Sequence, residues 1–441
     1  MSRRNRRWTM RRVRALVRHS GPTSLIFRRR LALMGGAILV GLAALIFASA
    51  ADQASEAFDR LVEAIWWLPL LLTPAGFAGI AWVTRTYAPY AGGSGIPQVI
   101  AATRLPEQIG TRLVDLRTAL LKVVLTVGGL LVGASVGREG PTVQISAAIL
   151  ARFHAILQVP LRTSVMIAGG AAGVAAAFNT PLAGISFAIE ELASAYEQRM
   201  TLLVITAVII SGMVSLGLAG DYVYFGAVAA HLPLGSAMVV ALFAGVLGGL
   251  SGGLFARLAL AAATSRNRLT DWSRAHPIQF AAACGMLVAV IGVISGMTWG
   301  TSYAPARHLI TGGQEPLWFA PAKFVSTLAT SISGIPGGIF APSLATGAGF
   351  GNLLRWMFPE QQASAVVLLG MVAYFTGVVR APLTAVIIIS ETTGSRGFML
   401  PLLGAALVAD GAAQRICRDR LYHGLSRAFH DRAKAAGVAP S

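Results

Sequence analysis

Long apolar runs dominate the chain and predict helices that cross a membrane. The runs at 31–50, 202–218 and 280–297 each approach the roughly 20 residues that a helix needs to span the hydrocarbon core of a bilayer. The polar stretches between such runs are too short to form a separate soluble domain. This pattern predicts an all-α, polytopic membrane protein.

Several other apolar segments are shorter and are interrupted by glycine and proline. Segment 66–83 contains Pro69 and Pro74, and segments 181–193 and 338–350 have the same character. A broken helix is tolerated inside a membrane only where protein or a water-lined cavity covers its exposed backbone. Transporters build binding sites near the bilayer midplane from such half-helices, so these segments indicate a buried site.

An internal repeat links the two parts of the chain. It has a constant offset of 201 residues without a gap, and it predicts two structurally equivalent halves. The repeat alone leaves open whether the halves are parallel or inverted. The matching positions are Gly137, Pro141, Gly169, Ala172, Pro181, Leu182 and Glu190 in the first half and Gly338, Pro342, Gly370, Ala373, Pro382, Leu383 and Glu391 in the second.

The charge of the chain is concentrated at its two ends. The 441 residues are 55% hydrophobic and 12% charged, with a net charge of +18. Flanking arginines resist translocation, so both termini are expected in the cytoplasm and the number of full crossings is expected to be even. We interpret this charge as a topology signal rather than as nucleic-acid binding, and contact with anionic membrane lipid is compatible with it. The basic residues at the two ends are eleven arginines within 1–30, and Arg415, Arg418, Arg420, Arg427, Arg432 and Lys434 near and after the end of the last apolar run.

These boundaries divide the chain into a basic cytoplasmic arm at 1–30, a transmembrane region at 31–424 and a short cytoplasmic tail at 425–441. Ala48-Ser49-Ala50 resembles a signal-peptide cleavage site. However, the basic region before it is about 30 residues long, and further membrane segments follow. A retained first helix is therefore favoured over a cleaved signal peptide.

The residue types that carry most enzyme chemistry are sparse. Cys284 and Cys417 offer neither a disulfide framework nor a metal cluster, and the seven histidines show no His-Glu-x-x-His spacing. No Walker loop and no cysteine–histidine or serine–histidine grouping is apparent. We expect no metal, no cofactor and no enzymatic activity.

Three glycine- and proline-containing segments carry the candidate chemistry. In each, glycines precede a proline that suits the first turn of a helix, where its missing N–H has no intrahelical partner. Such helix starts present free N–H groups and a partial positive charge, and several aimed at one point form an anion site that releases its ion more readily than a full charge would. The alternative is that glycine and proline merely break helices. The segments are 93–97 (Gly93, Ser94, Gly95, Ile96, Pro97), 137–141 (Gly137, Arg138, Glu139, Gly140, Pro141) and 337–342 (Gly337, Gly338, Ile339, Phe340, Ala341, Pro342).

Glu139 is the most informative single residue because it lies between glycines in an apolar region. A carboxylate at the bilayer centre costs about 2.5 kcal/mol or more, so it must be protonated, paired or facing water. Arg138 is one possible partner, although residues adjacent in sequence do not face each other on a helix. We interpret Glu139 as a tethered carboxylate that competes with the anion and leaves the site when protonated.

Glu190 and Glu191 end the short segment after Pro181 and should have different surroundings, since adjacent helical residues point about 100° apart. Glu190 has the repeat partner Glu391, which suggests a structural pair. Glu191 has Thr392 at its equivalent position and is the better candidate for a proton path. Lys122 and Lys323 also interrupt apolar stretches, and pairing with a buried glutamate is the expected role.

The combined segments resemble the CLC family of chloride channels and chloride/proton antiporters. The resemblance rests on Gly-Ser-Gly-Ile-Pro at 93–97, Gly-Arg-Glu-Gly-Pro at 137–141 and Gly-x-Phe-x-Pro at 338–342, with Ala381-Pro382-Leu383-Thr384 and Leu421-Tyr422 in support. It covers about residues 31–427 and implies a homodimer whose subunits each contain inverted repeats of tilted, broken helices.

The resemblance also implies roles for individual residues. A central chloride would be bound by the hydroxyls of Ser94 and Tyr422 and by the amides of Ile339 and Phe340, and Glu139 would match the external gating glutamate. Without the resemblance, Tyr422 would be interpreted as an interfacial belt tyrosine.

Glu191 matches the internal proton-transfer glutamate found in many exchangers of this family. This favours chloride/proton antiport, with a passive chloride channel of the same fold as the alternative. Ser94 favours chloride over nitrate, whose transporters in the family have proline there, and over fluoride. Only about 19 residues follow Tyr422, which leaves no room for paired nucleotide-sensing domains and suggests a bacterial inner-membrane protein.

Overall fold

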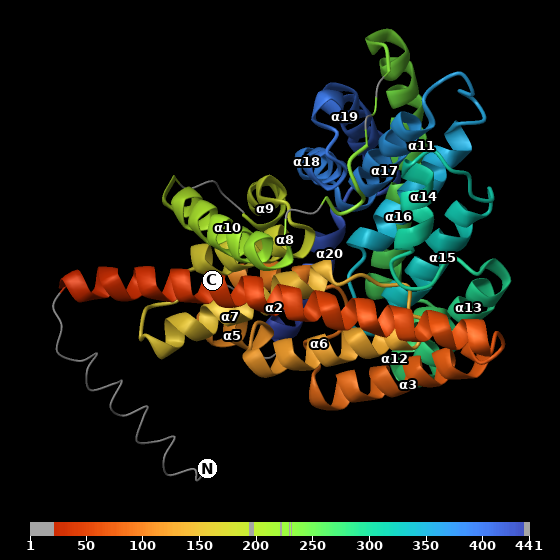
Figure 1. Ribbon diagram of the computed structural model, residues 1–441. Helices are drawn as coiled ribbons and strands as arrows, with labels where there is room; N and C mark the ends of the chain where they lie inside the picture. Colours follow the sequence, from red (N-terminus) through yellow and green to blue (C-terminus); the bar gives the residue numbers. More distant parts are fainter. Residues whose placement is uncertain (1–21, 194–197, 221–222, 229, 231, 436–441) are drawn as a thin grey trace.

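The computed structural model describes residues 22–193, 198–220, 223–228, 230 and 232–435, and within them the chain is helical (Figure 1). Most of the predicted basic arm lies outside the described residues, and the first described helix begins at Pro22. The elements of the first half are α2 (Pro22–Ala64), α3 (Pro69–Tyr87), α4 (Ile96–Arg104), α5 (Glu107–Leu113), α6 (Leu116–Leu131), α7 (Glu139–Ile156), α8 (Thr163–Phe178), α9 (Pro181–Phe187), the π-helical turn η1 (Ala188–Leu192) and α10 (Gln198–Ala219).

The second half repeats this order with its own insertions. A final helix, α20 (Leu421–Ala435), follows it. The elements of the second half are α11 (Leu234–Thr264), α12 (Arg268–Ala275), α13 (Pro277–Ser295), α14 (Tyr303–Ile310), α15 (Phe319–Ile332), α16 (Phe340–Leu354), α17 (Ala363–Val379), α18 (Pro382–Thr393), the 3-10 turn η2 (Arg396–Phe398) and α19 (Met399–Ile416).

The predicted equivalence of the two halves is confirmed by helix boundaries at the 201-residue offset. Helices α7 and α16 begin at Glu139 and Phe340, and α9 and α18 begin at Pro181 and Pro382. Helices α8 and α17 are followed by Asn179 and Arg380, two non-glycine residues in the left-handed conformation with φ of 57° and 64°. The antiparallel bridge between Gly137 and Gly338 shows that equivalent segments of the two halves meet head to head about a local two-fold axis.

Five described helices are long and apolar enough to cross a bilayer, and several others are shorter. The five are Leu25–Ala64, Thr201–Ala219, Leu234–Thr264, Pro277–Ser295 and Arg396–Ile416. With 43 residues, α2 is about twice as long as an upright crossing requires, so it must be tilted or extend beyond the hydrocarbon. It runs across the molecule and packs against α6, α7, α8 and α10 (Figure 1).

Proline has different effects at the two positions singled out in segment 66–83. Pro69 opens α3, as expected for a first-turn proline. Pro74 lies inside α3 without ending it, which differs from the predicted interruption. Its missing N–H removes one hydrogen bond near the start of the helix, and the packing of α3 against α13 and α6 supports the remaining turns.

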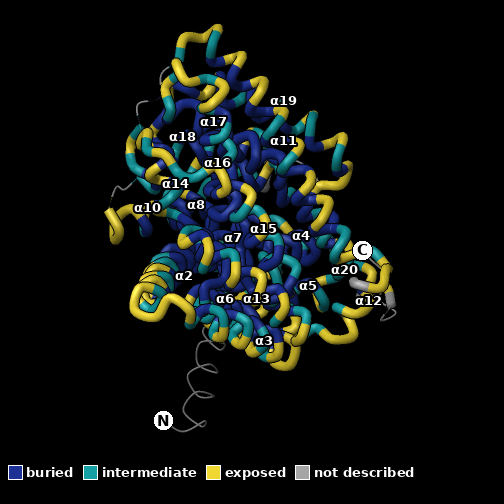
Figure 2. The backbone as a smooth tube through the Cα atoms, turned by 90° about the vertical axis from the view of Figure 1, so that its right-hand side faces the viewer, coloured by how far each residue is buried: buried dark blue, intermediate teal, exposed yellow. Residues whose placement is uncertain are grey.

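Two of the shorter apolar helices, α8 and α17, lie in the centre of the molecule. Every residue of α8 from Val165 to Phe178 is buried, and so is every residue of α17 from Ser364 to Val379. Because these helices are apolar on all sides, they require protein neighbours around their whole circumference. Figure 2 shows the buried segments in the interior, where α7, α8 and α16 lie, with exposed segments around them.

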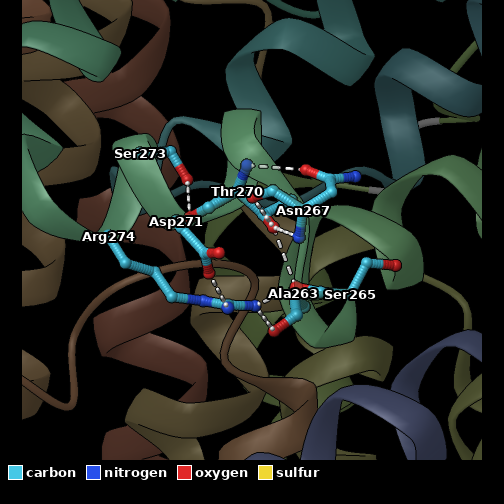
Figure 3. Close-up of polar contacts among 7 residues, drawn as sticks. All are labelled: Ala263, Ser265, Asn267, Thr270, Asp271, Ser273 and Arg274. Atoms are coloured by element: carbon cyan, nitrogen blue, oxygen red, sulfur yellow. Dashed lines mark hydrogen bonds and ion pairs between the residues drawn. The ribbon is translucent and has the colours of Figure 1, made fainter.

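The connection between α11 and α13 is polar and has its own hydrogen-bond network (Figure 3). Asn267 Oδ1 accepts from the Thr270 N–H at 2.9 Å, and Thr270 Oγ1 accepts from the Asn267 N–H at 3.0 Å, which forms a capping box at the start of α12. Arg274 donates to the carbonyl of Ser265 at 2.6 Å and caps the end of α11. This short helix therefore joins two membrane-spanning helices and supplies hydrogen-bond donors to the end of α11.

Candidate anion-binding site

The three segments identified from their glycines and prolines meet in the interior. The Gly93 N–H donates to the carbonyl of Ile335 at 3.1 Å, and the Gly337 N–H donates to the carbonyl of Gly93 at 3.2 Å. These bonds join the loop before α4 to the loop before α16. The two loops come from different halves, so the site lies at the interface between the repeats.

Gly137 and Gly338 bring the remaining segment into contact. Each donates its N–H to the carbonyl of the other, both at 2.8 Å. A Cβ on Gly338 would lie 2.9 Å from the Gly140 nitrogen and 3.0 Å from the Gly137 oxygen, so only glycine allows this approach. The starts of α7 and α16 are thereby held side by side.

Helices α4, α7 and α16 all begin in this region without a side-chain cap. Gly95 precedes α4 with φ of 103°, a left-handed conformation suited to glycine. Pro97, Pro141 and Pro342 lie within the first three residues of their helices, as predicted. Uncapped first turns leave backbone N–H groups available, and their partial positive charge attracts an anion.

Two hydroxyl groups complete this arrangement. Ser94 Oγ and the Tyr422 hydroxyl are buried and lie next to each other, and neither has a hydrogen-bond partner among the other described residues. Tyr422 is fully buried, and its ring lies 6.1 Å from the ring of Phe340 at the start of α16. A buried polar group without a partner costs about 1–3 kcal/mol, so two adjacent hydroxyls beside three uncapped helix starts favour a ligand site at this point.

Glu139 lies at the same place as the first residue of α7. Its side chain is fully buried, and both carboxylate oxygens lack a hydrogen-bond partner in the described part of the chain. The carboxylate lies over Gly137, where an added Cβ would collide with Oε2, and it is close to the backbone N–H of Ala341 in the first turn of α16. It therefore occupies the positive end of the α16 dipole.

Arg138 does not pair with Glu139, although it was the possible partner by sequence. Its guanidinium donates to the carbonyl of Ala48 at 2.8 Å and to Asp52 Oδ1 at 2.5 Å. Arg138 and Asp52 border a pocket of about 960 Å³, which is also lined by Tyr224 and Trp299. The arginine thus anchors the start of α7 to α2, and the carboxylate of Glu139 has no ion pair with a basic residue in the described part of the chain.

Glu190 and Glu191 point in different directions, as their adjacent positions predict. Glu190 accepts from the N–H groups of Leu383 and Thr384, at 3.0 and 2.6 Å, and belongs to the structural pair with Glu391. Glu191 is fully buried, and its Oε1 lies 3.1 Å from His423 Nδ1. Glu191 lies on η1, outside the group formed by Ser94, Glu139, Phe340 and Tyr422, although it is close enough to Tyr422 to interact electrostatically.

His423 was not identified as a site residue from the sequence. The sequence feature that could have identified it is its position directly after Tyr422, since consecutive residues at a helix start can reach two different sites. Tyr422 lies beside Ser94, whereas His423 reaches Glu191.

The expectation for Lys122 and Lys323 is wrong. Lys122 donates to the carbonyls of Ala91 and Gly93 at 2.7 and 2.9 Å, and Lys323 donates to the carbonyls of Thr298 and Gly300 at 3.0 and 2.7 Å. Neither contacts a glutamate within the described residues. The two lysines are 201 residues apart in the sequence and support equivalent loops. Each donates to carbonyl oxygens that irregular backbone exposes, and such oxygens need donors inside a membrane protein.

Comparison with known proteins identifies the family. A family model described as "Voltage gated chloride channel" matches residues 75–414. The chain belongs to this family. CLC proteins of this kind are membrane transporters, and the chain is a multi-pass membrane protein with a CLC fold.

Solved structures show the same fold. A slow cyanobacterial Cl⁻/H⁺ antiporter has a TM-score of 0.77 and 24% identity, and the alignment covers 92% of this chain and 99% of that one. A CLC-type fluoride/proton antiporter has a TM-score of 0.76 and 20% identity over the same shares, 92% and 99%. A eukaryotic CLC transporter has a TM-score of 0.75 and 24% identity over 91% of this chain and 74% of that one.

Proposed function

We propose that this CLC protein exchanges chloride for protons across its membrane. The observation that carries the proposal is the pair of adjacent, buried hydroxyls of Ser94 and Tyr422, which have no other partner among the described residues, beside three uncapped helix starts. Together with the backbone amides of Ile339 and Phe340, these groups form the anion site. All are neutral donors, so they bind a halide through partial charges that allow it to leave.

Glu139 acts as the gate and as the external proton acceptor. Its carboxylate competes with the anion for the positive end of α16, because it lies near the Ala341 N–H. Protonation removes this attraction, and the side chain then leaves the anion path. A single group thus couples proton binding to anion movement.

Glu191 transfers protons on the other side of the anion site. Its side chain is fully buried, and His423 is the basic residue within hydrogen-bonding distance of it among the described residues. These surroundings suit a group that changes its protonation state. Two of the structurally similar proteins are described as proton-coupled antiporters, one for chloride and one for fluoride. We favour chloride for this chain because Ser94 lies in a Gly-Ser-Gly-Ile-Pro segment.

The proposed setting follows the topology and the family resemblance. The protein functions as a homodimer in a bacterial inner membrane, with residues 1–30 and 425–441 in the cytoplasm. Residues 31–424 form the transmembrane region, whose outer surface contacts membrane lipid. Flanking arginines support this orientation.

One measurement tests the transport mode. In proteoliposomes with opposed chloride and pH gradients, antiport predicts a reversal potential that depends on both gradients. A reversal potential that follows chloride alone would identify a passive channel instead. Replacing chloride with fluoride in the same assay tests the anion, and we expect a smaller flux with fluoride.

A further inference from the structure

The first turn of α20 contacts both the candidate anion site and the candidate internal proton site. Arg420, just before the helix, donates to the carbonyl of Glu190 at 2.9 Å. Tyr422 lies beside Ser94, and His423 contacts Glu191 at 3.1 Å. Consecutive residues of one rigid element therefore reach both sites.

Glu190 and Glu191 both lie on the π-helical turn η1, and their side chains point in different directions. It spans Ala188–Leu192, and such turns are frequent at functional sites because they redirect side chains within a helix. Glu190 points to the start of α18, where it is satisfied by backbone N–H groups. Glu191 points to α20, where only one of its oxygens has a hydrogen-bond partner among the described residues.

His423 lies between Glu191 and the molecular surface. The side chain of Glu191 has 0% exposure, whereas that of His423 has 22%. His423 is the only described residue that hydrogen-bonds to the Glu191 carboxylate. One ring nitrogen contacts the buried acid while part of the ring is open to the surface, which is the arrangement that a proton relay requires.

On the basis of the proposed antiport, we propose that His423 carries protons between the cytoplasmic solution and Glu191. In the inward step, Nε2 takes a proton from water while the proton on Nδ1 moves to Glu191 Oε1. The carboxylate becomes a carboxylic acid, and the ring stays neutral with its proton on Nε2. A ring flip, or return of that proton to water and uptake on Nδ1, restores the starting tautomer.

Few of the described charged residues lie near the Glu191–His423 pair. Glu190 and Arg420 act electrostatically on Glu191, with opposite signs. Of the helices packed against α20, α4 carries Arg104, α11 carries Arg257 and α17 has no charged residue. On α20 itself, Arg427 is paired with Asp419 at 2.9 Å. His423 is therefore the titratable group through which Glu191 communicates with solution.

The test compares two histidines on the same helix. In His423→Asn, the amide keeps a donor close to the position of Nδ1 but cannot carry a proton, and His430→Asn is the matched control because His430 Nδ1 contacts only the carbonyl of Ser426 at 3.0 Å. Chloride flux and chloride-driven proton uptake are measured in the same proteoliposomes as a function of internal pH. We expect His423→Asn to lower proton uptake by about tenfold or more, while His430→Asn matches the unmodified protein.

Imidazole rescue separates a relay from a positioning role. In His423→Ala, imidazole added on the cytoplasmic side should restore proton uptake in proportion to its concentration, and His430→Ala should show no such response. Unchanged proton uptake in both His423 variants would overturn the relay, and loss without imidazole rescue would overturn it in favour of a positioning role. If the unmodified protein itself shows no chloride-driven proton uptake, the proposed antiport fails first and the relay falls with it.

Discussion

Glu190 and Glu391, which are 201 residues apart, each cap the short helix of the opposite half. Glu190 accepts from Leu383 and Thr384 at the start of α18, and Glu391 accepts from Leu182 and Ala183 at the start of α9, the latter at 3.3 and 2.9 Å. This exchange has the reciprocity of a two-fold axis between the repeats. A carboxylate at a helix start is favourable because it meets both free N–H groups and the positive end of the dipole.

Removing either cap should destabilise the protein. Glu190 also accepts from Thr384 Oγ1 at 2.7 Å, so Glu190→Ala should have a larger effect than Glu391→Ala. We expect losses of about 1–3 kcal/mol in the free energy of unfolding, measured as a lower thermal midpoint in detergent. Glu360→Ala, at an exposed position, is the control and should leave the midpoint unchanged. Equal midpoints for all three variants would show that the reciprocal caps do not stabilise the repeat interface.

Neutralising Glu139 should separate the two transported ions. In Glu139→Gln, the amide cannot take up a proton, so we expect chloride flux to persist while proton uptake falls by about 100-fold or more. Glu191→Gln should have the same effect on protons, because it interrupts the path on the other side of the anion site. Both fluxes are measured in the same proteoliposomes, and proton uptake that survives both changes would contradict the assigned roles.

Removing the hydroxyl of Tyr422 should weaken anion binding. Hydrogen bonds to charged groups contribute about 1.5–3 kcal/mol, so Tyr422→Phe should raise the chloride dissociation constant by about 10- to 100-fold. Tyr374→Phe is the matched control, since Tyr374 is another buried tyrosine and its ring stacks on Phe350. Isothermal titration calorimetry gives both constants. An unchanged constant in Tyr422→Phe would exclude the hydroxyl as a ligand.

Adding a methyl group at Gly140 should disturb the meeting point of the helix starts. A Cβ there would collide with Ser94 Oγ and would lie 3.2 Å from the Cα of Gly338. We expect Gly140→Ala to lower stability by about 1–3 kcal/mol and to weaken chloride binding, because Ser94 must move. Gly79→Ala is the control, since Gly79 is helical and exposed and an added Cβ meets nothing within 4 Å. Chloride affinity that is equal in the two variants would show that Ser94 tolerates displacement.

Much of the fold was predictable because its signals are local. A long apolar run predicts a membrane helix wherever it occurs, and glycine followed by proline predicts a helix start. The structure accordingly places the starts of α4, α7 and α16 at the predicted segments. Gly137 and Gly338 also illustrate the value of the repeat, since equivalent residues in a two-fold arrangement can contact each other directly.

Residue type determined the candidate chemistry but not the partners of each charged group. Arg138 was considered as a partner for Glu139 because it is adjacent in sequence, yet it contacts Asp52, 86 residues away. Lys122 and Lys323 were expected to pair with acids, but they bind backbone carbonyls. Carbonyl groups occur at every residue, so no sequence pattern reports which of them lack an intrahelical donor.

The sequence by itself therefore determined the membrane helices, the broken segments, the two halves and the uncapped helix starts near Ser94, Glu139 and Phe340. Only the tertiary structure decided that the halves are related head to head, that Glu190 and Glu391 cap each other's helices, and that His423 contacts Glu191. The physical reason is distance along the chain: helix starts depend on neighbouring residues, whereas the last contact joins groups 232 residues apart that meet only when both halves have packed.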